Sequence, residues 1–180
     1  MQVLTGILLL ARFRPEGLAL FTPSAVAFLN SLAPMLAITA VAGLRPLLTG
    51  HFHVLAMHVL SNVIALLTPA VTSHAFARLW QREERWLRYV VAMNWCHTAL
   101  SLPATLLMLV FVAGADDGVV SGLPALLTVA FAIYWFVFSC FLVREGLGVS
   151  RLRSVVAVIL PGVLVTLLVV APLLLRVALT

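Results

Sequence analysis

Apolar residues dominate the chain in five long stretches, and short polar segments separate these stretches. The stretches cover residues 25–44, 54–73, 89–113, 120–143 and 155–177. A helix needs about 20 predominantly apolar residues to cross the hydrocarbon core of a bilayer, and each stretch reaches that length. The pattern therefore predicts an all-α fold, a five-helix transmembrane bundle that occupies residues 25–180.

Residues 1–24 precede the first span as a separate N-terminal segment. Residues 7–20 are typical of an amphipathic interfacial helix, because the leucines and Phe13 can lie in lipid while the neighbouring arginines meet phosphates. A disordered tail is the alternative. Thr22 or Ser24 is expected to cap the first span.

The composition fits a protein that folds in lipid. Hydrophobic residues make up 63% of the chain and charged residues 9%, whereas a soluble domain has about 25% charged residues. The net charge is +5, and every basic residue is Arg, as is typical of a GC-rich bacterial genome. Because the arginines cluster beside the spans, anionic lipid head groups are the expected partner rather than nucleic acid.

The arginines also predict the orientation of the protein. Nine of the eleven lie in the N-terminal segment and in the loops after the second and fourth spans, and two lie on the opposite side. Cytoplasmic segments carry the excess of basic residues. The expected topology is a multi-pass protein of a bacterial inner membrane, with its N-terminus in the cytoplasm and its C-terminus in the periplasm.

Two cytoplasmic segments are candidate surfaces for lipid head groups or a protein partner. Residues 78–88 are predicted to extend the second span, turn and begin the third, with Trp80 and Trp86 at the head-group level. The second segment follows the fourth span. The candidate binding residues are Arg78, Arg82, Arg85, Arg88, Arg144, Arg151 and Arg153.

Polar residues also occur inside the second and third spans. Asn94, His97, Thr98 and Ser101 recur at helical spacing and predict one polar stripe, which a matching stripe of the second span is expected to face. Such stripes either bond helices together or line a polar cavity or proton path. The candidates are Asn62, Thr68, Asn94, His97 and Ser101, and Asn94 is expected near Thr68.

Each span also contains an internal or near-internal proline, which can kink a helix. These prolines are Pro34, Pro69, Pro103, Pro124 and Pro161. Kinked helices either gate a cavity or simply pack well in a bundle, and the sequence leaves both readings open.

The sequence gives no support for catalysis or for a cofactor. None of the common catalytic motifs occurs, and no charged residue lies near the centre of a span. His58 and His97 are the histidines best placed to ligate a haem from two spans. They are expected to differ in depth by about 12 Å, which is too much for one iron. No metal or other cofactor is therefore expected, and the protein is expected not to be an enzyme.

The run EERWLRYVVAMNW over residues 83–95 carries a family resemblance. It is similar to an E-R-x-x-R-(F/Y)-(I/V)-V-A-x-N-W stretch in small alphaproteobacterial membrane proteins that resemble the Yip family. Residues 141–150, FLVREGLGVS, resemble a second element of that pattern. Near the first span the family usually has Trp-Arg-Ser where this chain has Leu-Asn-Ser. Arg85, Asn94, Trp95 and Arg144 are the residues that match the pattern.

This resemblance implies a five-span membrane protein that has no known catalytic residues. The expected function is that of a non-enzymatic, Yip-like interaction or membrane-organising component, with the lipid bilayer and a protein partner or a second copy of the chain as its contacts. The alternative is a small transporter or channel that uses the intramembrane polar stripe.

Overall fold

The structure is a computed structural model and describes residues 2–113 and 122–178. The described part contains helices and no strand, so the prediction of an all-α fold is confirmed. Five of these helices are long and apolar enough to cross a membrane. The elements are α1 Gln2–Ala11, the 3-10 helix η1 Pro15–Leu20, α2 Ala25–Leu48, α3 Phe52–Leu79, α4 Glu83–Ala113, α5 Leu123–Leu147 and α6 Arg151–Ala178.

The helix ends follow from local chemistry. Of the two predicted caps, Thr22 and Ser24, it is Ser24 that caps α2, because its side chain accepts a hydrogen bond of 3.1 Å from the backbone N–H of Ala27. α5 ends at Leu147, and Gly148 follows as its C-cap, with a φ of +64° that favours glycine and an N–H that donates to the carbonyl of Arg144. α3 and α4 are joined by residues 80–82 alone. The prediction that residues 78–88 extend one span and begin the next is therefore confirmed.

Four of the five predicted prolines lie in helix interiors, and the fifth lies at a helix start. α2, α3, α4 and α6 continue through Pro34, Pro69, Pro103 and Pro161. Pro124 lies instead in the first turn of α5. A proline is well tolerated there, because its missing N–H has no partner within the helix at that position.

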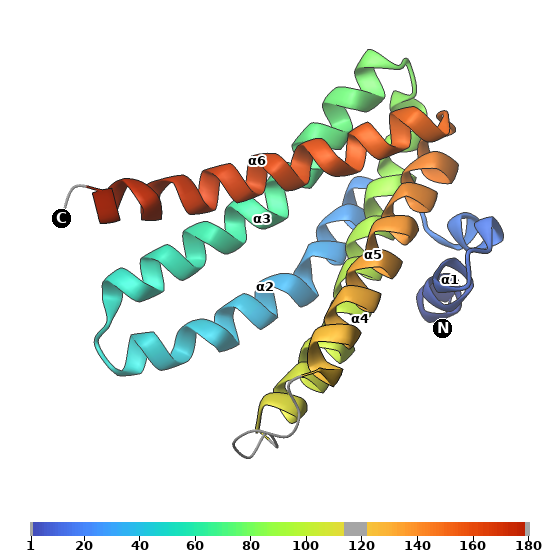
Figure 1. Ribbon diagram of the computed structural model, residues 1–180. Coiled ribbons are helices and arrows are strands. Elements are labelled where there is room, and N and C mark those ends of the chain that lie inside the picture. The colour runs from blue at the N-terminus through green and yellow to red at the C-terminus, as the bar shows by residue number, and fades with distance from the viewer. Residues whose placement is uncertain (1, 114–121, 179–180) are drawn as a thin grey trace.

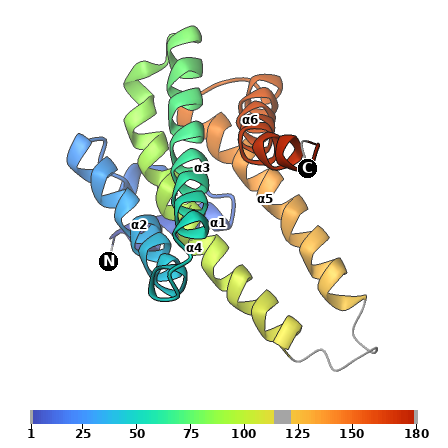
Figure 2. The ribbon, with the colours of Figure 1, turned by 90° about the vertical axis from the view of Figure 1, so that its left-hand side faces the viewer.

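The helices converge at one end and spread apart toward the other (Figure 1). α2 and α3 form one hairpin and α4 and α5 form another, and α6 packs against α3 and α5. A view turned by 90° shows that the two hairpins extend from the converged end in different directions (Figure 2). The buried core lies at the converged end, where it includes Ala77, Tyr89, Val90, Val91, Ala92, Cys96, Phe138, Leu142, Val143 and Leu147.

The N-terminal segment packs on the bundle. α1 and η1 lie on the side of α4 and α5 that faces away from the α2–α3 turn (Figure 1). Ile7 and Leu10 are buried, and the hydroxyl of Tyr134 in α5 donates a hydrogen bond of 2.9 Å to the carbonyl of Ala11. The ring of Phe13 contacts three aromatic rings of α5 edge-on.

The structure divides residues 7–20 differently from the single helix that the sequence predicted, and their interfacial position stays a prediction. The segment forms two short helices separated at residues 12–14, because Phe13 has a φ of +58° and Pro15 begins η1. Some of its apolar side chains pack against the bundle and others are exposed. Phe13 does both, because its ring contacts α5 and is still partly exposed. Apolar residues that suit lipid also suit a protein surface of the same polarity.

Candidate functional site

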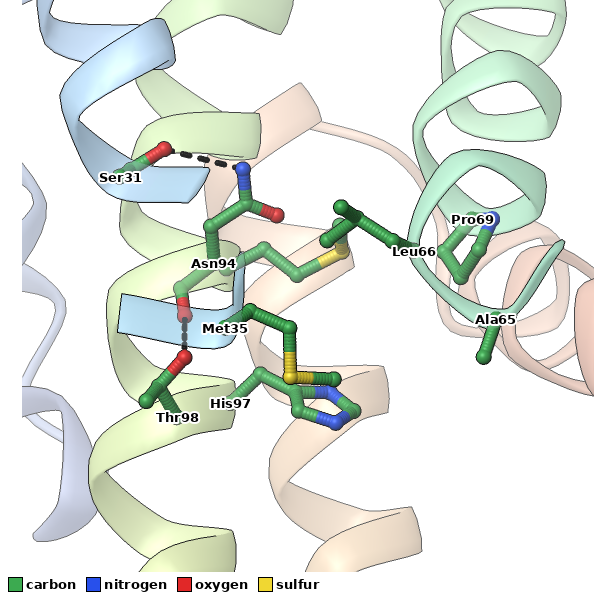
Figure 3. A pocket seen from close by; sticks show the side chains of 9 residues that line it. Ser31, Met35, Ala65, Leu66, Pro69, Asn94, His97 and Thr98 are labelled. Atoms are coloured by element: carbon green, nitrogen blue, oxygen red, sulfur yellow. Dashed lines mark hydrogen bonds between the residues drawn. The ribbon is translucent and has the colours of Figure 1, made fainter. Parts of the chain in front are cut away.

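The clearest polar contact inside the bundle joins α2 to α4. The side-chain amide of Asn94 donates a hydrogen bond of 2.9 Å to the hydroxyl of Ser31, and both residues are buried (Figure 3). The Ser31 hydroxyl donates in turn to the carbonyl of Phe28 at 2.6 Å. Because lipid offers no competing water, such a bond fixes the rotation of both helices.

This pairing differs from the one that the sequence predicted. Asn94 was expected near Thr68 of α3, but its partner is Ser31 of α2. The amide of Asn62 donates to the carbonyl of His58 within its own helix, at 2.8 Å. Ser101 likewise reaches only a carbonyl of α4, at 3.5 Å. The carbonyl of Thr68 accepts from the hydroxyl of Thr72 at 2.6 Å, also within α3.

The five candidates therefore do not form one polar stripe across two helices. Asn94 and His97 line a common hollow, together with Ser31 and Thr98. Among the described residues that line it, the other three candidates, Asn62, Thr68 and Ser101, do not occur. The periodicity of α4 placed the polar residues on one face correctly, but that face meets α2 as well as α3 (Figure 3).

The hollow beside Asn94 is small. Its volume is about 40 Å³, and α2, α3 and α4 each contribute to its wall. A single water needs only about 10–15 Å³ of such volume and two to four polar partners. The hydroxyl of Ser31, the amide of Asn94 and the imidazole of His97 supply those partners.

A larger cavity of about 290 Å³ lies between α3, α4, α5 and α6. His97 borders both spaces, and its ring meets Trp135 of α5 edge-on with centroids 4.9 Å apart. Pro69 of α3 and Pro161 of α6 line the cavity, and its hydroxyl-bearing residues are Ser73, Tyr89 and Ser139. The wall is mostly apolar with a few polar groups, as in sites that bind small molecules.

Two tryptophans hold the arginine-rich end together. Trp86 of α4 donates from its indole N–H to the hydroxyl of Ser73 in α3 at 3.1 Å, and its ring meets His74 with centroids 4.6 Å apart. Trp80 stacks on Phe76, and the guanidinium of Arg153 in α6 lies 5.8 Å from the centre of its ring. Trp86 is therefore half-buried in helix contacts and is not only a head-group anchor.

Most of the candidate arginines are exposed at the converged end. Arg78 pairs with Glu83 at 3.2 Å, and Arg85 approaches Glu84 at 3.8 Å. These side chains are at least half exposed, so the pairs stabilise the fold by at most about 1 kcal/mol each. Their guanidinium groups remain able to bind an external anion.

One arginine has a structural task as well. A side chain added at Gly148 would collide with the guanidinium of Arg85, so Arg85 lies directly over the end of α5. A cation at a helix C-terminus is favourable, because the helix dipole is negative there. Arg85 and Arg88 also border a polar cleft of about 390 Å³, together with Glu84 and Glu145.

The described residues contain no group of three His, Cys, Asp or Glu side chains that could hold a metal ion. Cys96 is buried and Cys140 is half-buried, and both are free thiols.

The fold and these sites define a multi-pass, all-helical membrane protein with an arginine-rich, well-packed end. No family model matches this chain, and no curated protein and no solved structure matches it either.

Proposed function

We propose that the protein is a non-enzymatic interaction or membrane-organising component of a bacterial inner membrane, similar in kind to Yip-family proteins. In this proposal its arginine-rich end faces the cytoplasm and its C-terminus faces the periplasm. The α3–α4 turn, residues 78–88, is the docking surface for a protein partner, and the surrounding arginines hold anionic head groups.

One observation carries the proposal. The exposed arginines of the α3–α4 turn lie at the converged end of the bundle, where the core is buried. Contacts from three helices brace the turn, because Trp86 bonds to Ser73 and Arg153 packs on Trp80. A braced surface binds a partner with a smaller loss of conformational entropy than a mobile loop does.

The test is affinity purification of the tagged protein in mild detergent, with mass spectrometry of the proteins and lipids that come with it. We compare the natural chain with the double variant Arg82→Gln/Arg88→Gln. Arg85 stays unchanged, because it also packs over the end of α5. The matched control is Arg12→Gln/Arg14→Gln, which removes the same charge from the N-terminal segment.

A stoichiometric partner that is lost from the first variant and kept by the control would support the proposal. Recovery of the chain with lipid alone, from natural protein and variants alike, would contradict a docking role for the turn.

A small transporter or channel is the second candidate, and the cavity of about 290 Å³ beside His97 favours it. We expect a transporter to lose flux in His97→Ala without losing abundance. Ser101→Ala is the control, because Ser101 lies on the same helix but does not line the cavity. Proton flux into vesicles that contain a pH-sensitive dye is the first readout, and equal flux in both variants and in empty vesicles would count against transport.

A further inference from the structure

A separate groove of about 460 Å³ runs along α5 and α6 at the arginine-rich end. None of its lining residues also lines the cavity of about 290 Å³ beside His97. Its wall is apolar over most of its length and carries two cationic side chains. The lining residues are Phe13, Phe136, Val137, Cys140, Phe141, Arg144, Arg151, Ser154 and Val155.

The cationic end of the groove has capacity to bind an anion. Nε and Nη2 of Arg144 both donate to one oxygen of Glu145, at 2.9 and 2.6 Å. A guanidinium has five N–H donors, so donors of Arg144 remain. Arg151 is exposed at the start of α6, and within the described residues its guanidinium makes no ion pair. The two arginines outweigh the one carboxylate beside them.

The apolar part of the groove continues away from the arginines along α5. Phe141, Val137 and Phe136 follow Arg144 in that direction, and Phe136 lies eight residues from it. At 1.5 Å per residue this is about 12 Å of helix. A phosphate at the arginines would thus place an attached acyl chain along the apolar wall, at the depth of the hydrocarbon core.

We propose that this groove binds one anionic phospholipid, with its phosphate on Arg144 and Arg151 and an acyl chain along Phe141, Val137 and Phe136. The charge of the groove selects an anionic lipid, and its apolar length selects a lipid over a free phosphate. The inference rests on the proposed function, since it names a specific lipid site on the arginine-rich end.

The experiment measures how many phosphatidylglycerol molecules the purified protein retains in mild detergent, by native mass spectrometry, with phosphatidylcholine as the neutral comparison. Arg144→Gln/Arg151→Gln should lower the affinity for phosphatidylglycerol by about tenfold, because a hydrogen bond to a charged group corresponds to about that factor. Arg82→Gln/Arg88→Gln loses the same charge outside the groove and should retain the lipid.

Two further variants test the two halves of the groove separately. Glu145→Gln should increase retention of phosphatidylglycerol, because it releases Arg144 from its ion pair. Val137→Trp should decrease retention of both lipids by filling the apolar wall. Ile133→Trp is its control, since Ile133 is also exposed on α5 but does not line the groove.

The outcomes separate this inference from the proposed function. Equal loss of phosphatidylglycerol in Arg144→Gln/Arg151→Gln and in Arg82→Gln/Arg88→Gln would overturn the proposed lipid site, since lipid binding would then depend on net charge alone. Unchanged retention in Arg144→Gln/Arg151→Gln would overturn it as well. If Arg82→Gln/Arg88→Gln still lost a protein partner in either case, the proposed docking function would stand without the groove. Loss of lipid from the groove variant, with no partner found at all, would support the groove and contradict the docking role.

Discussion

The close contact between α4 and α5 gives the sharpest stability prediction. Gly146 lies in the last turn of α5 and faces the ring of Tyr89. A Cβ atom at residue 146 would lie 2.6 Å from Cδ2 of Tyr89 and 3.0 Å from its Cβ. Tyr89 is only 4% exposed, and its hydroxyl donates to the sulfur of Met93 at 3.2 Å. The ring therefore has little room to move, and Gly146→Ala should force the two helices apart.

The magnitude follows from two opposing effects. Overpacking a tight core costs about 1–3 kcal/mol, whereas Gly→Ala inside a helix gains about 1 kcal/mol in helix propensity. Gly146→Ala should therefore reduce the free energy of unfolding by about 0–2 kcal/mol. Gly162 of α6 is the matched control, because a Cβ there meets nothing within 4 Å. Gly162→Ala should gain about 1 kcal/mol from helix propensity with no collision, so the variants should differ by about 1–3 kcal/mol.

Reversible unfolding in mixed micelles, as the fraction of denaturing detergent rises, measures this difference by circular dichroism. Replacing Tyr89 by Ala in the Gly146→Ala background removes the ring atoms that come closest and leaves only the Cβ contact at 3.0 Å, so the two changes should be less costly together than the sum of their separate effects. Equal stability of Gly146→Ala and Gly162→Ala would refute the close packing of α4 on α5.

Three further contacts give predictions of their own. A double-mutant cycle with Ser31→Ala and Asn94→Ala should yield a coupling of about 0.6 to 1.7 kcal/mol in the same assay, and zero coupling would rule out their bond as a stabilising contact. Trp86→Phe should lower stability by about 1 kcal/mol through loss of its hydrogen bond to Ser73, and unchanged stability would contradict that bond. Tyr134→Phe should open the N-terminal segment more often, because it loses the bond to α1. Tryptic cleavage after Arg12 should then become about fivefold faster, and an unchanged rate would contradict the docking of α1.

The sequence was sufficient to predict the spans and the short α3–α4 turn. Hydropathy is averaged over about 20 residues, so it tolerates local exceptions. The cap at Ser24 was also predictable, since it depends on the residues next to it. The helices nevertheless extend beyond the apolar stretches, as α4 begins at Glu83 and α3 reaches Leu79. Polar residues in the outer turns continue a helix into the head-group region without adding to its apolar length.

The partner of Asn94 was not predictable from the sequence. Helical spacing shows that polar residues share a face, but it does not show which neighbour that face meets. α4 packs against α2, α3, α5 and α1, so a stripe on it has several possible partners. The docking of Phe13 and Leu10 was missed for a related reason. A bilayer and a protein interior are equally apolar, and the sequence cannot distinguish one from the other.

The side-chain hydrogen bonds between the spanning helices are distributed unevenly, and this distribution bears on the choice between functions. Within the described residues, the hydrogen bonds of Asn94 to Ser31 and of Trp86 to Ser73 both lie in the halves of the helices next to the α3–α4 turn and the start of α2. The surfaces proposed for docking and for lipid are therefore supported by the best-packed part of the protein. A transport path would have to continue from His97 into the region where the hairpins diverge, and there lipid or a second copy of the chain would have to complete its wall. A loss of flux in His97→Ala would mean that lipid or a second copy completes the wall of the path. A loss of the partner in Arg82→Gln/Arg88→Gln needs no such addition, because the docking surface lies on this chain alone.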